Sequence, residues 1–203
     1  MSEPRFANEA ERTVWSRLVH DKPDDWIVLP NIRLTDEGKD HEVDLLVLAP
    51  GLGAVALEVK GGSVWVEGEE WRQGNPHRSH KIRPVEQALG GTYALREYVE
   101  TDPRWGGRRR ILWSWAVALP HSSISPDFAL PSCPRWAIHG RDDMARLAER
   151  LAASLRSQRE QRAPTLDDCQ LVAEILQGRN LPVRDVIATA LEHEDRADRL
   201  TAE

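Results

Sequence analysis

Apolar side chains recur with a helical spacing near the start of the chain. In residues 7–19, Val14, Trp15 and Leu18 fall on one side of an α-helix, and Glu11 falls on that same side. Apolar runs typical of strands follow at residues 26–34, 42–62 and 63–68. The run over 42–62 is divided by a Gly/Pro turn, so it predicts a hairpin.

The second half of the chain has a mixed pattern. Residues 75–84 show no periodicity, which predicts a loop. Beyond it the pattern predicts a helix starting at Pro84, two strands and three helices, over residues 84–100, 110–120, 135–140, 142–157, 166–177 and 182–197. Thr165 is placed to cap the helix over 166–177.

This order of elements predicts an α/β fold with a mixed central sheet flanked by helices and a C-terminal helical segment. We expect one domain over residues 1–157 and a helical extension or linker over 158–203. Cys133 and Cys169 lie far apart without metal-ligand spacing, which favours buried, reduced thiols in a cytoplasmic protein. No apolar run is long enough to span a membrane.

Charged side chains interrupt the hairpin where buried side chains are expected. Alternation along the second strand places Glu58 and Lys60 on one face. If residues 49–53 form the connection, Asp44 lies directly opposite Glu58, and Glu42 lies opposite Lys60. Like charges in opposed positions are destabilising unless a cation lies between them.

Lys60 or a divalent metal ion would supply that cation. Mg²⁺ prefers carboxylate oxygens and completes its coordination with water and phosphate oxygens, so the pair Asp44 and Glu58 suits it. With Lys60 beside the attacking water, this arrangement suits phosphodiester hydrolysis. An exposed hairpin that carries a cross-strand Glu–Lys pair only for solubility would have the same sequence pattern. The pattern alone therefore leaves both the catalytic and the solubility interpretation open.

Five ordered motifs carry a resemblance to a known family: NEAERTVWSRL, WIVLPNIRL, HEVDLLVLAPGLGAVALEVKGG, WRQG and NPHRSHKIRPVEQA. Over residues 8–100 the chain resembles the nuclease-related domain (NERD), a branch of the PD-(D/E)xK nuclease superfamily. The resemblance implies a restriction-endonuclease-like fold and hydrolysis of DNA that depends on Mg²⁺ or Mn²⁺.

The resemblance also implies roles for individual residues. The implied metal ligands are Asp44, Glu58, the carbonyl of Val59, and Glu11. The implied catalytic residues are Lys60, Glu58, Asp44 and Gln87. Two of these have plain alternatives, because Glu11 also suits the first turn of a helix and Gln87 also suits an ordinary surface position. After the lysine, Gly61 and Gly62 depart from the polar residue usual in the family.

Charge is distributed unevenly along the chain. The formal net charge of −6 argues against a generally basic nucleic-acid binder. Residues 71–83 nevertheless contain no acidic residue and four basic ones, Arg72, Arg78, Lys81 and Arg83. These predict a rim that contacts nucleic-acid phosphates beside the site, with a solvated loop as the alternative. His77 and His80 have no further Cys or His neighbour, so a zinc site is not expected.

The last four residues, LTAE, resemble the start of a segment that opens superfamily 1 helicase domains, to which NERD modules are often fused. We therefore expect DNA and a helicase domain in a longer parent chain as partners, with a homo-oligomer as a further option. A second hypothesis is a catalytically inactive, nuclease-like module that binds DNA, docks on a helicase or oligomerises. No phosphate-binding GxxxxGK[ST] motif occurs, so the chain itself is not the motor.

Overall fold

A computed structural model describes residues 4–36, 39–75, 77–158 and 161–178 of the 203-residue chain. The helix predicted over 182–197 and the LTAE motif lie outside the described residues. The long helices are α1 (Glu9–Asp21), α2 (Pro84–Thr101), α3 (Leu147–Ser157) and α4 (Leu166–Gly178). No described helix has the length and apolarity needed to cross a membrane.

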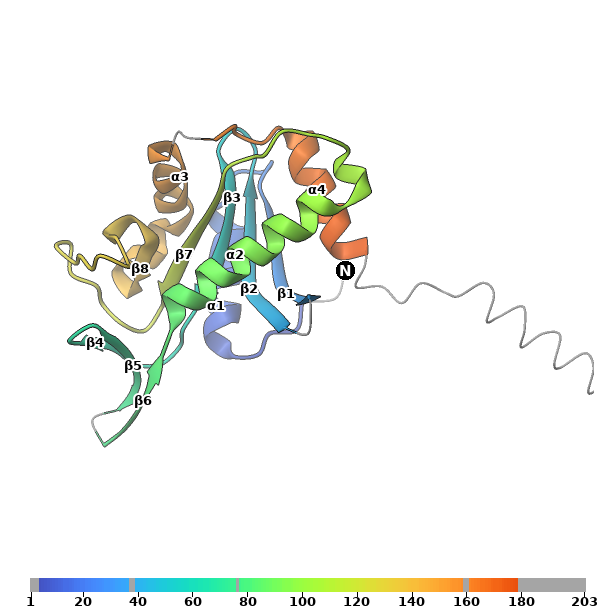
Figure 1. Ribbon diagram of the computed structural model, residues 1–203. Coiled ribbons are helices and arrows are strands. Elements are labelled where there is room, and N and C mark those ends of the chain that lie inside the picture. The colour runs from blue at the N-terminus through green and yellow to red at the C-terminus, as the bar shows by residue number, and fades with distance from the viewer. Residues whose placement is uncertain (1–3, 37–38, 76, 159–160, 179–203) are drawn as a thin grey trace, which may run out of the picture.

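The strands form two sheets (Figure 1). The central sheet has the order β1-β2-β3-β7-β8, with bounds Ile27–Asp36, Lys39–Ala49, Gly53–Val59, Trp113–Leu119 and Ile138–Gly140. A smaller sheet contains β4 (Val64–Glu67), β5 (Glu70–Asn75) and β6 (Arg78–Ile82). Short 3₁₀ helices cover Pro103–Trp105, Arg135–Ala137 and Arg141–Arg146.

The central sheet is mixed and covered on both faces. Strands β1, β2 and β3 are antiparallel, whereas β3, β7 and β8 are parallel. Helices α1 and α3 pack on the face that carries Val55 and Leu57, and α2 and α4 pack on the face that carries Ala54 and Ala56. Every residue of β3 is buried, which explains its nearly continuous apolar sequence. This is the expected restriction-endonuclease-like arrangement of a mixed sheet flanked by helices.

The hairpin has the register predicted from the sequence. Leu45 pairs with Leu57, Leu46 with Ala56, and Ala49 with Gly53. The turn between them uses Gly51 at φ +75°, a left-handed conformation that suits glycine. Leu45 and Leu57 are fully buried, and each such side chain contributes about 1.5–3 kcal/mol to stability. A slip by one residue would place these side chains on the opposite face, so burial fixes the register.

Helix α2 approaches the sheet closely beside the hairpin. A Cβ added at Gly91 would lie 2.6 Å from Cγ2 of Val43, so only glycine permits this contact without a shift. Gly91 therefore allows a close approach between α2 and β2. It fixes the first turn of α2, including Gln87, beside the end of β2 and β3.

The loop predicted over residues 75–84 is wrong, because half of that segment, Arg78–Ile82, forms strand β6. It pairs with β5, with Arg72 opposite Lys81 and Gln73 opposite His80. Polar side chains occupy both faces at the tip, so the alternation that reveals a strand is missing. We call strands β4–β6 the arm, since Figure 1 shows them standing away from the central sheet.

The arm is anchored at its base by apolar contacts. Val64 and Trp71 are buried, and they belong to a cluster that includes Val85 of α2 and Val117 of β7. Further out, the arm consists mainly of polar residues. Its base is therefore held by the core, while its tip is supported by the strand pairing.

Other boundaries shift slightly from the predicted ones. The helix expected over 142–157 begins at Leu147, after a 3₁₀ turn over Arg141–Arg146. The strand expected over 135–140 contains a 3₁₀ turn followed by the short strand β8. Cys133 and Cys169 are free and buried, as predicted.

Charged side chains fasten α4 to the rest of the fold. Asp168, with a side chain 2% exposed, accepts hydrogen bonds from Arg108 at 2.9 Å, Arg162 at 2.5 Å and the Thr165 backbone N–H at 2.8 Å. The Thr165 hydroxyl accepts from the Asp168 N–H at 3.1 Å, so the predicted cap is confirmed. Burial by itself raises the pKa of Asp168, but these hydrogen bonds outweigh burial and hold the pKa well below its usual range.

Replacing Asp168→Asn is expected to lower the free energy of unfolding at pH 7 by about 2–3 kcal/mol, because charge-assisted hydrogen bonds are lost. The folded pKa lies below the unfolded value of about 3.9. The ionised carboxylate therefore stabilises the fold above about pH 4, and this contribution is lost as the pH falls through the folded value. Urea unfolding should show that the difference in unfolding free energy between the parent protein and Asp168→Asn becomes smaller below about pH 4.

Asp167→Asn is the matched control, since Asp167 also pairs with Arg108 but its side chain is 73% exposed. Exposed ion pairs contribute little, so its cost should stay below about 1 kcal/mol. Two outcomes would contradict the role given to Asp168. One is an equal loss of unfolding free energy in the two variants, and the other is a difference between Asp168→Asn and the parent protein that stays constant down to pH 3.

Candidate active site

A polar pocket of about 290 Å³ lies where β2 and β3 meet the first turns of α1 and α2. We call it the carboxylate pocket. Its lining residues come from α1 and the segment before it, from β2, β3 and β5, and from α2: Ala7, Asn8, Glu11, Glu42, Asp44, Glu58, Val59, Lys60, Gly61, Gln73 and Gln87. All the residues for which the resemblance implies metal binding or catalysis are therefore brought together here.

Asp44 and Glu58 lie on the neighbouring strands β2 and β3, and both are almost completely buried, with 9% and 5% of their surfaces exposed. Asp44 accepts a hydrogen bond from the backbone N–H of Val59 at 2.7 Å. Lys60 Nζ lies 2.6 Å from Glu58 Oε1. The paired register of the hairpin, continued by one residue, places the two carboxylates opposite each other.

Glu11 reaches the pocket from the start of α1 and is 3% exposed. Its carboxylate accepts from the Ala7 N–H at 3.0 Å and from Asn8 Nδ2 at 2.5 Å, while its own N–H donates to Asn8 Oδ1 at 3.1 Å. These reciprocal bonds cap the helix and fix the direction of the side chain. The same carboxylate therefore both caps α1 and lines the pocket.

Two further polar side chains of the pocket were not selected from the sequence. Glu42 lies two residues before Asp44, so alternation along β2 puts it on the same face, and it is ion-paired with Arg33 at 2.9 Å. Gln73 of β5 donates to the carbonyl of Gly61 at 2.7 Å. The alternation of side chains along β2 was enough to predict that Glu42 lies on the same face as Asp44. Gln73 reaches the pocket only because the arm folds back, and no sequence pattern indicated that.

The electrostatics of the pocket are dominated by buried carboxylates. Burial raises the pKa of Asp44 to about 7, and the nearby Glu58 adds to this rise while the Val59 N–H opposes it. Burial also raises the pKa of Glu58, and the charge and hydrogen bond of Lys60 oppose that rise. Without a further cation, the pocket therefore favours proton uptake near neutral pH.

The donor set fits a hard divalent ion. Carboxylate and carbonyl oxygens are the ligands that Mg²⁺ and Mn²⁺ prefer, and Asp44, Glu58 and Val59 line one pocket. Within the ranges that the structure describes, no three His, Cys, Asp or Glu side chains are grouped so that they could hold a metal ion alone. Two carboxylates leave positions for the Val59 carbonyl, water and phosphate oxygens, and Mg²⁺ commonly binds in this way.

The four predicted nucleic-acid contacts lie outside this pocket, on the arm and at its junction with α2. Arg72 is 2.7 Å from Glu67, and Lys81 is 2.5 Å from Glu70. Arg78 and Arg83 are exposed, at the start of β6 and immediately before α2. The four residues thus lie on the arm or beside it, and they differ in their ion-pair partners.

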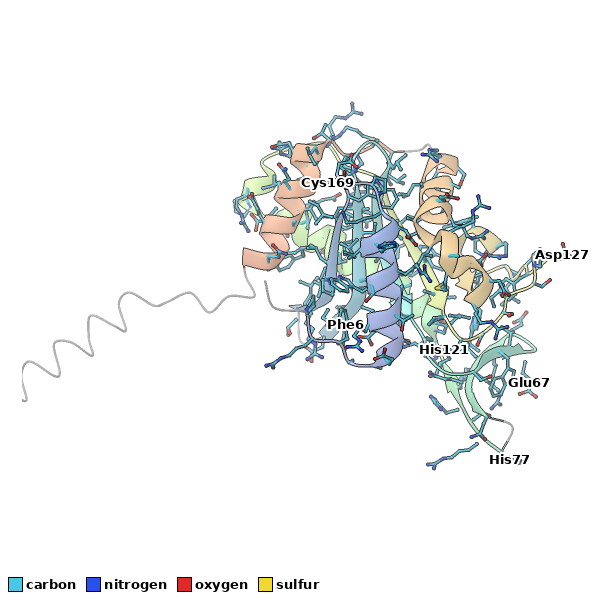
Figure 2. The ribbon with its side chains drawn as sticks, turned by 180° about the vertical axis from the view of Figure 1, so that it is seen from behind. Phe6, Glu67, His77, His121, Asp127 and Cys169 are labelled. Atoms are coloured by element: carbon cyan, nitrogen blue, oxygen red, sulfur yellow. The ribbon has the colours of Figure 1, made fainter. Side chains whose placement is uncertain are left out.

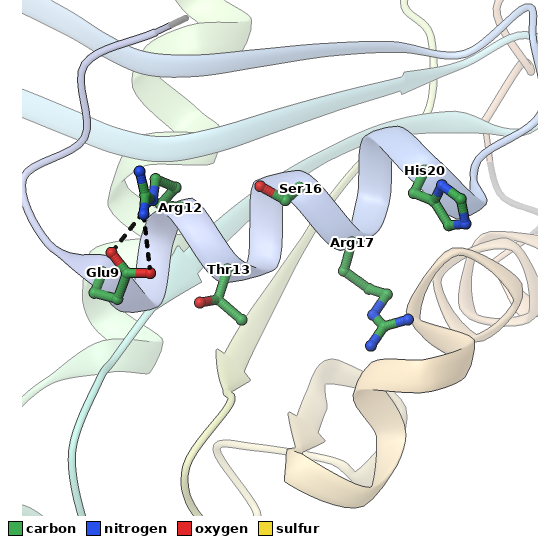
Figure 3. A pocket seen from close by; sticks show the side chains of 6 residues that line it. All are labelled: Glu9, Arg12, Thr13, Ser16, Arg17 and His20. Atoms are coloured by element: carbon green, nitrogen blue, oxygen red, sulfur yellow. Dashed lines mark hydrogen bonds and ion pairs between the residues drawn. The ribbon is translucent and has the colours of Figure 1, made fainter.

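A separate hollow of about 490 Å³ runs along the outer side of α1 and is lined by Glu9, Arg12, Thr13, Ser16, Arg17 and His20 (Figure 3). Glu9 and Arg12 form an ion pair there at 3.2 Å. None of the buried carboxylates lines this larger hollow, so it lacks the chemistry of the carboxylate pocket.

Comparison with known proteins agrees with this geometry. The family model of the nuclease-related domain (NERD) matches residues 7–117, which is more than half of the chain. The match begins just before α1 and extends into β7, so it contains every residue of the carboxylate pocket. No curated protein and no solved structure matches the chain. The chain belongs to the nuclease-related domain family.

Proposed function

We propose that this domain hydrolyses phosphodiester bonds of DNA with a bound Mg²⁺ or Mn²⁺ ion. The observation that carries the proposal is the meeting of Asp44 and Glu58, both nearly buried, with Lys60 in one pocket. Buried like charges are costly, and a fold retains them most readily where a cation is bound. The family match supports a nuclease-related role.

Each residue has a distinct part in this proposal. Asp44, Glu58 and the Val59 carbonyl hold the ion, with Glu11 on the α1 side of the pocket. A divalent ion in this place polarises the phosphoryl oxygen and lowers the pKa of the attacking water. Gln87 supports the site from α2 by hydrogen bonding to water or phosphate.

Lys60 completes the catalytic group. Its ammonium lies 2.6 Å from Glu58 and is partly buried, with 20% of the side chain exposed. In this position it donates hydrogen bonds to the attacking water and offsets the negative charge that develops on the phosphoryl group. The low exposure of the pocket strengthens this interaction relative to the same contact in bulk water.

The alternative is a nuclease-like module that binds DNA without cleaving it. The rim residues Arg72, Arg78, Lys81 and Arg83 serve both proposals equally, whereas the buried carboxylates serve catalysis alone. Coupling to a helicase domain, a homo-oligomer, a cytoplasmic location and a domain boundary at 157/158 remain predictions from the sequence.

Lys60→Ala is expected to reduce Mg²⁺- or Mn²⁺-dependent cleavage of DNA by at least about 100-fold, since a group that stabilises developing charge is removed. The fold should persist, because the remaining pocket keeps its other hydrogen bonds. Cleavage of a labelled oligonucleotide and thermal unfolding together measure the two effects.

Lys22→Ala is the matched control, since Lys22 caps the opposite end of α1 and its ammonium donates to the Pro23 carbonyl. It should leave the cleavage rate unchanged. Equal rates for Lys60→Ala and the parent protein would reject the catalytic assignment. DNA binding without cleavage by the parent under any divalent ion would favour the binding module.

Asp44→Asn is expected to stabilise the metal-free protein at pH 8 by roughly 2–4 °C in melting temperature, or about 1 kcal/mol. The folded pKa of Asp44 is raised to about 7, so ionisation destabilises the fold as the pH rises from the unfolded value toward 7. Asparagine keeps an oxygen that accepts the Val59 N–H but carries no charge. The gain should shrink toward pH 5 in EDTA-containing buffer.

Added Mn²⁺ should raise the melting temperature of the parent protein but not that of Asp44→Asn, because a ligand stabilises only the state that binds it. A lower melting temperature for Asp44→Asn in EDTA at pH 8 would show that the charge of Asp44 is not a source of strain. Equal Mn²⁺ shifts in both proteins would place the ion elsewhere.

A further inference from the structure

A second hollow adjoins the carboxylate pocket and leads from it to the arm. Its volume is about 540 Å³, and it shares Asn8, Gly61 and Gln73 with the carboxylate pocket. The rest of its wall includes Gly62, Ser63, Gly74, His80 and His121. We call the two hollows together the groove. Figure 2 shows His121 at the base of the arm and His77 at its tip.

Two consecutive glycines line the groove where the two hollows meet. Gly61 lines both of them, and a Cβ added there would lie 2.9 Å from Cβ of Ala10. Gly62 follows at φ +69°, a conformation that favours glycine. The glycine pair that departs from the usual family motif therefore lets the backbone approach α1 closely and adds no side chain to the wall of the groove directly after Lys60.

Hydrogen-bond donors are placed along this passage. His121 Nδ1 accepts from the N–H of Gly62 at 2.9 Å, so its neutral ring carries a proton on Nε2 and presents a donor. His80 lines the groove from β6. Among the described residues, no Phe, Trp or Tyr side chain lines either hollow, and His80 and His121 are the aromatic rings in the walls.

Strand pairing sorts the basic residues of the arm by face. Gln73 lies opposite His80, and Asn75 lies opposite Arg78, so these four side chains share the face of the groove. Arg72 and Lys81 are opposed to each other on the other face. Both are ion-paired with acidic residues of the arm, whereas Arg78 is exposed and has no ion pair among the described residues.

The carboxylate pocket alone would repel a polyanion. Four carboxylates, those of Glu11, Glu42, Asp44 and Glu58, line it against the single lysine Lys60. A phosphate chain that reaches the pocket therefore needs cations and donors just outside it. His80 and His121 line that approach, and Arg78 lies two residues before His80 on the same face of β6.

We propose that the groove-facing side of the arm binds the sugar–phosphate backbone of one nucleic-acid strand and leads it into the carboxylate pocket. This inference rests on the proposed function. Arg78, His80 and His121 contact phosphates, and the strand is bound regardless of its base sequence because contacts to phosphates carry no sequence information. A single strand is the proposed substrate class, because the two carboxylates are nearly buried and a flexible strand can bend to reach them.

Binding of a 5′-fluorescein-labelled 20-nucleotide deoxythymidine oligomer in EDTA, followed by fluorescence anisotropy, tests this proposal without cleavage. Arg78→Ala should weaken binding roughly 5- to 10-fold and reduce the slope of log K against log salt by about 0.7, the value for one phosphate contact on a single strand. His80→Ala should weaken binding by about 3-fold. A mixed-sequence oligomer should bind as tightly, and a blunt duplex more weakly.

Two variants control for loss of charge alone. Arg156→Ala removes one positive charge from the exposed last turn of α3, and Arg109→Ala removes one from the exposed segment before β7, at the far end of the central sheet. Each should weaken binding less than 2-fold. Equal losses for Arg78→Ala and either control, no measurable binding by the parent, or preference for the duplex would overturn the proposal.

The outcome is separable from that of the proposed hydrolysis. If Arg78→Ala binds roughly 5- to 10-fold more weakly than the parent, yet nothing is cleaved with Mg²⁺ or Mn²⁺, the groove assignment stands and the hydrolysis fails. If the parent cleaves and Arg78→Ala cleaves with an unchanged kcat/KM, the hydrolysis stands and the groove assignment fails.

Discussion

Repulsion between two buried carboxylates is the constraint on which this site depends. Asp44 and Glu58 lie on neighbouring strands, and burial raises the pKa of both. The fold compensates locally: the Val59 N–H donates to Asp44, and the Lys60 ammonium lies 2.6 Å from Glu58. These contacts reduce the repulsion but leave a pocket that gains free energy when a cation or a proton enters it.

The rest of the structure supplies stability that offsets the unfavourable burial of these carboxylates. The central sheet is covered on both faces, and β3, which carries Glu58, is buried along its whole length. Glu11 is held by the cap of α1, and Gly91 lets α2 approach β2 closely. Rigid elements therefore converge on the pocket from three sides, as a preorganised site requires.

The sequence was sufficient to predict the central hairpin and its register, because burial allows only one register for Leu45 and Leu57. It was insufficient for the arm. Strand β6 has polar residues on both faces, so its pairing with β5 left no periodic signal. For the same reason the sequence grouped Arg78 with Lys81, although strand pairing places them on opposite faces. Such distinctions depend on a partner strand that local patterns do not reveal.

The central claim is that Asp44 and Glu58 jointly hold one divalent ion. Anomalous diffraction from crystals soaked in Mn²⁺ tests it most directly, because the scattering locates the ion without reference to activity. We predict a single strong peak between the two carboxylates, within about 2.0–2.2 Å of an oxygen of each. A peak bound by neither or by only one of them, or no peak in the carboxylate pocket, would contradict the account.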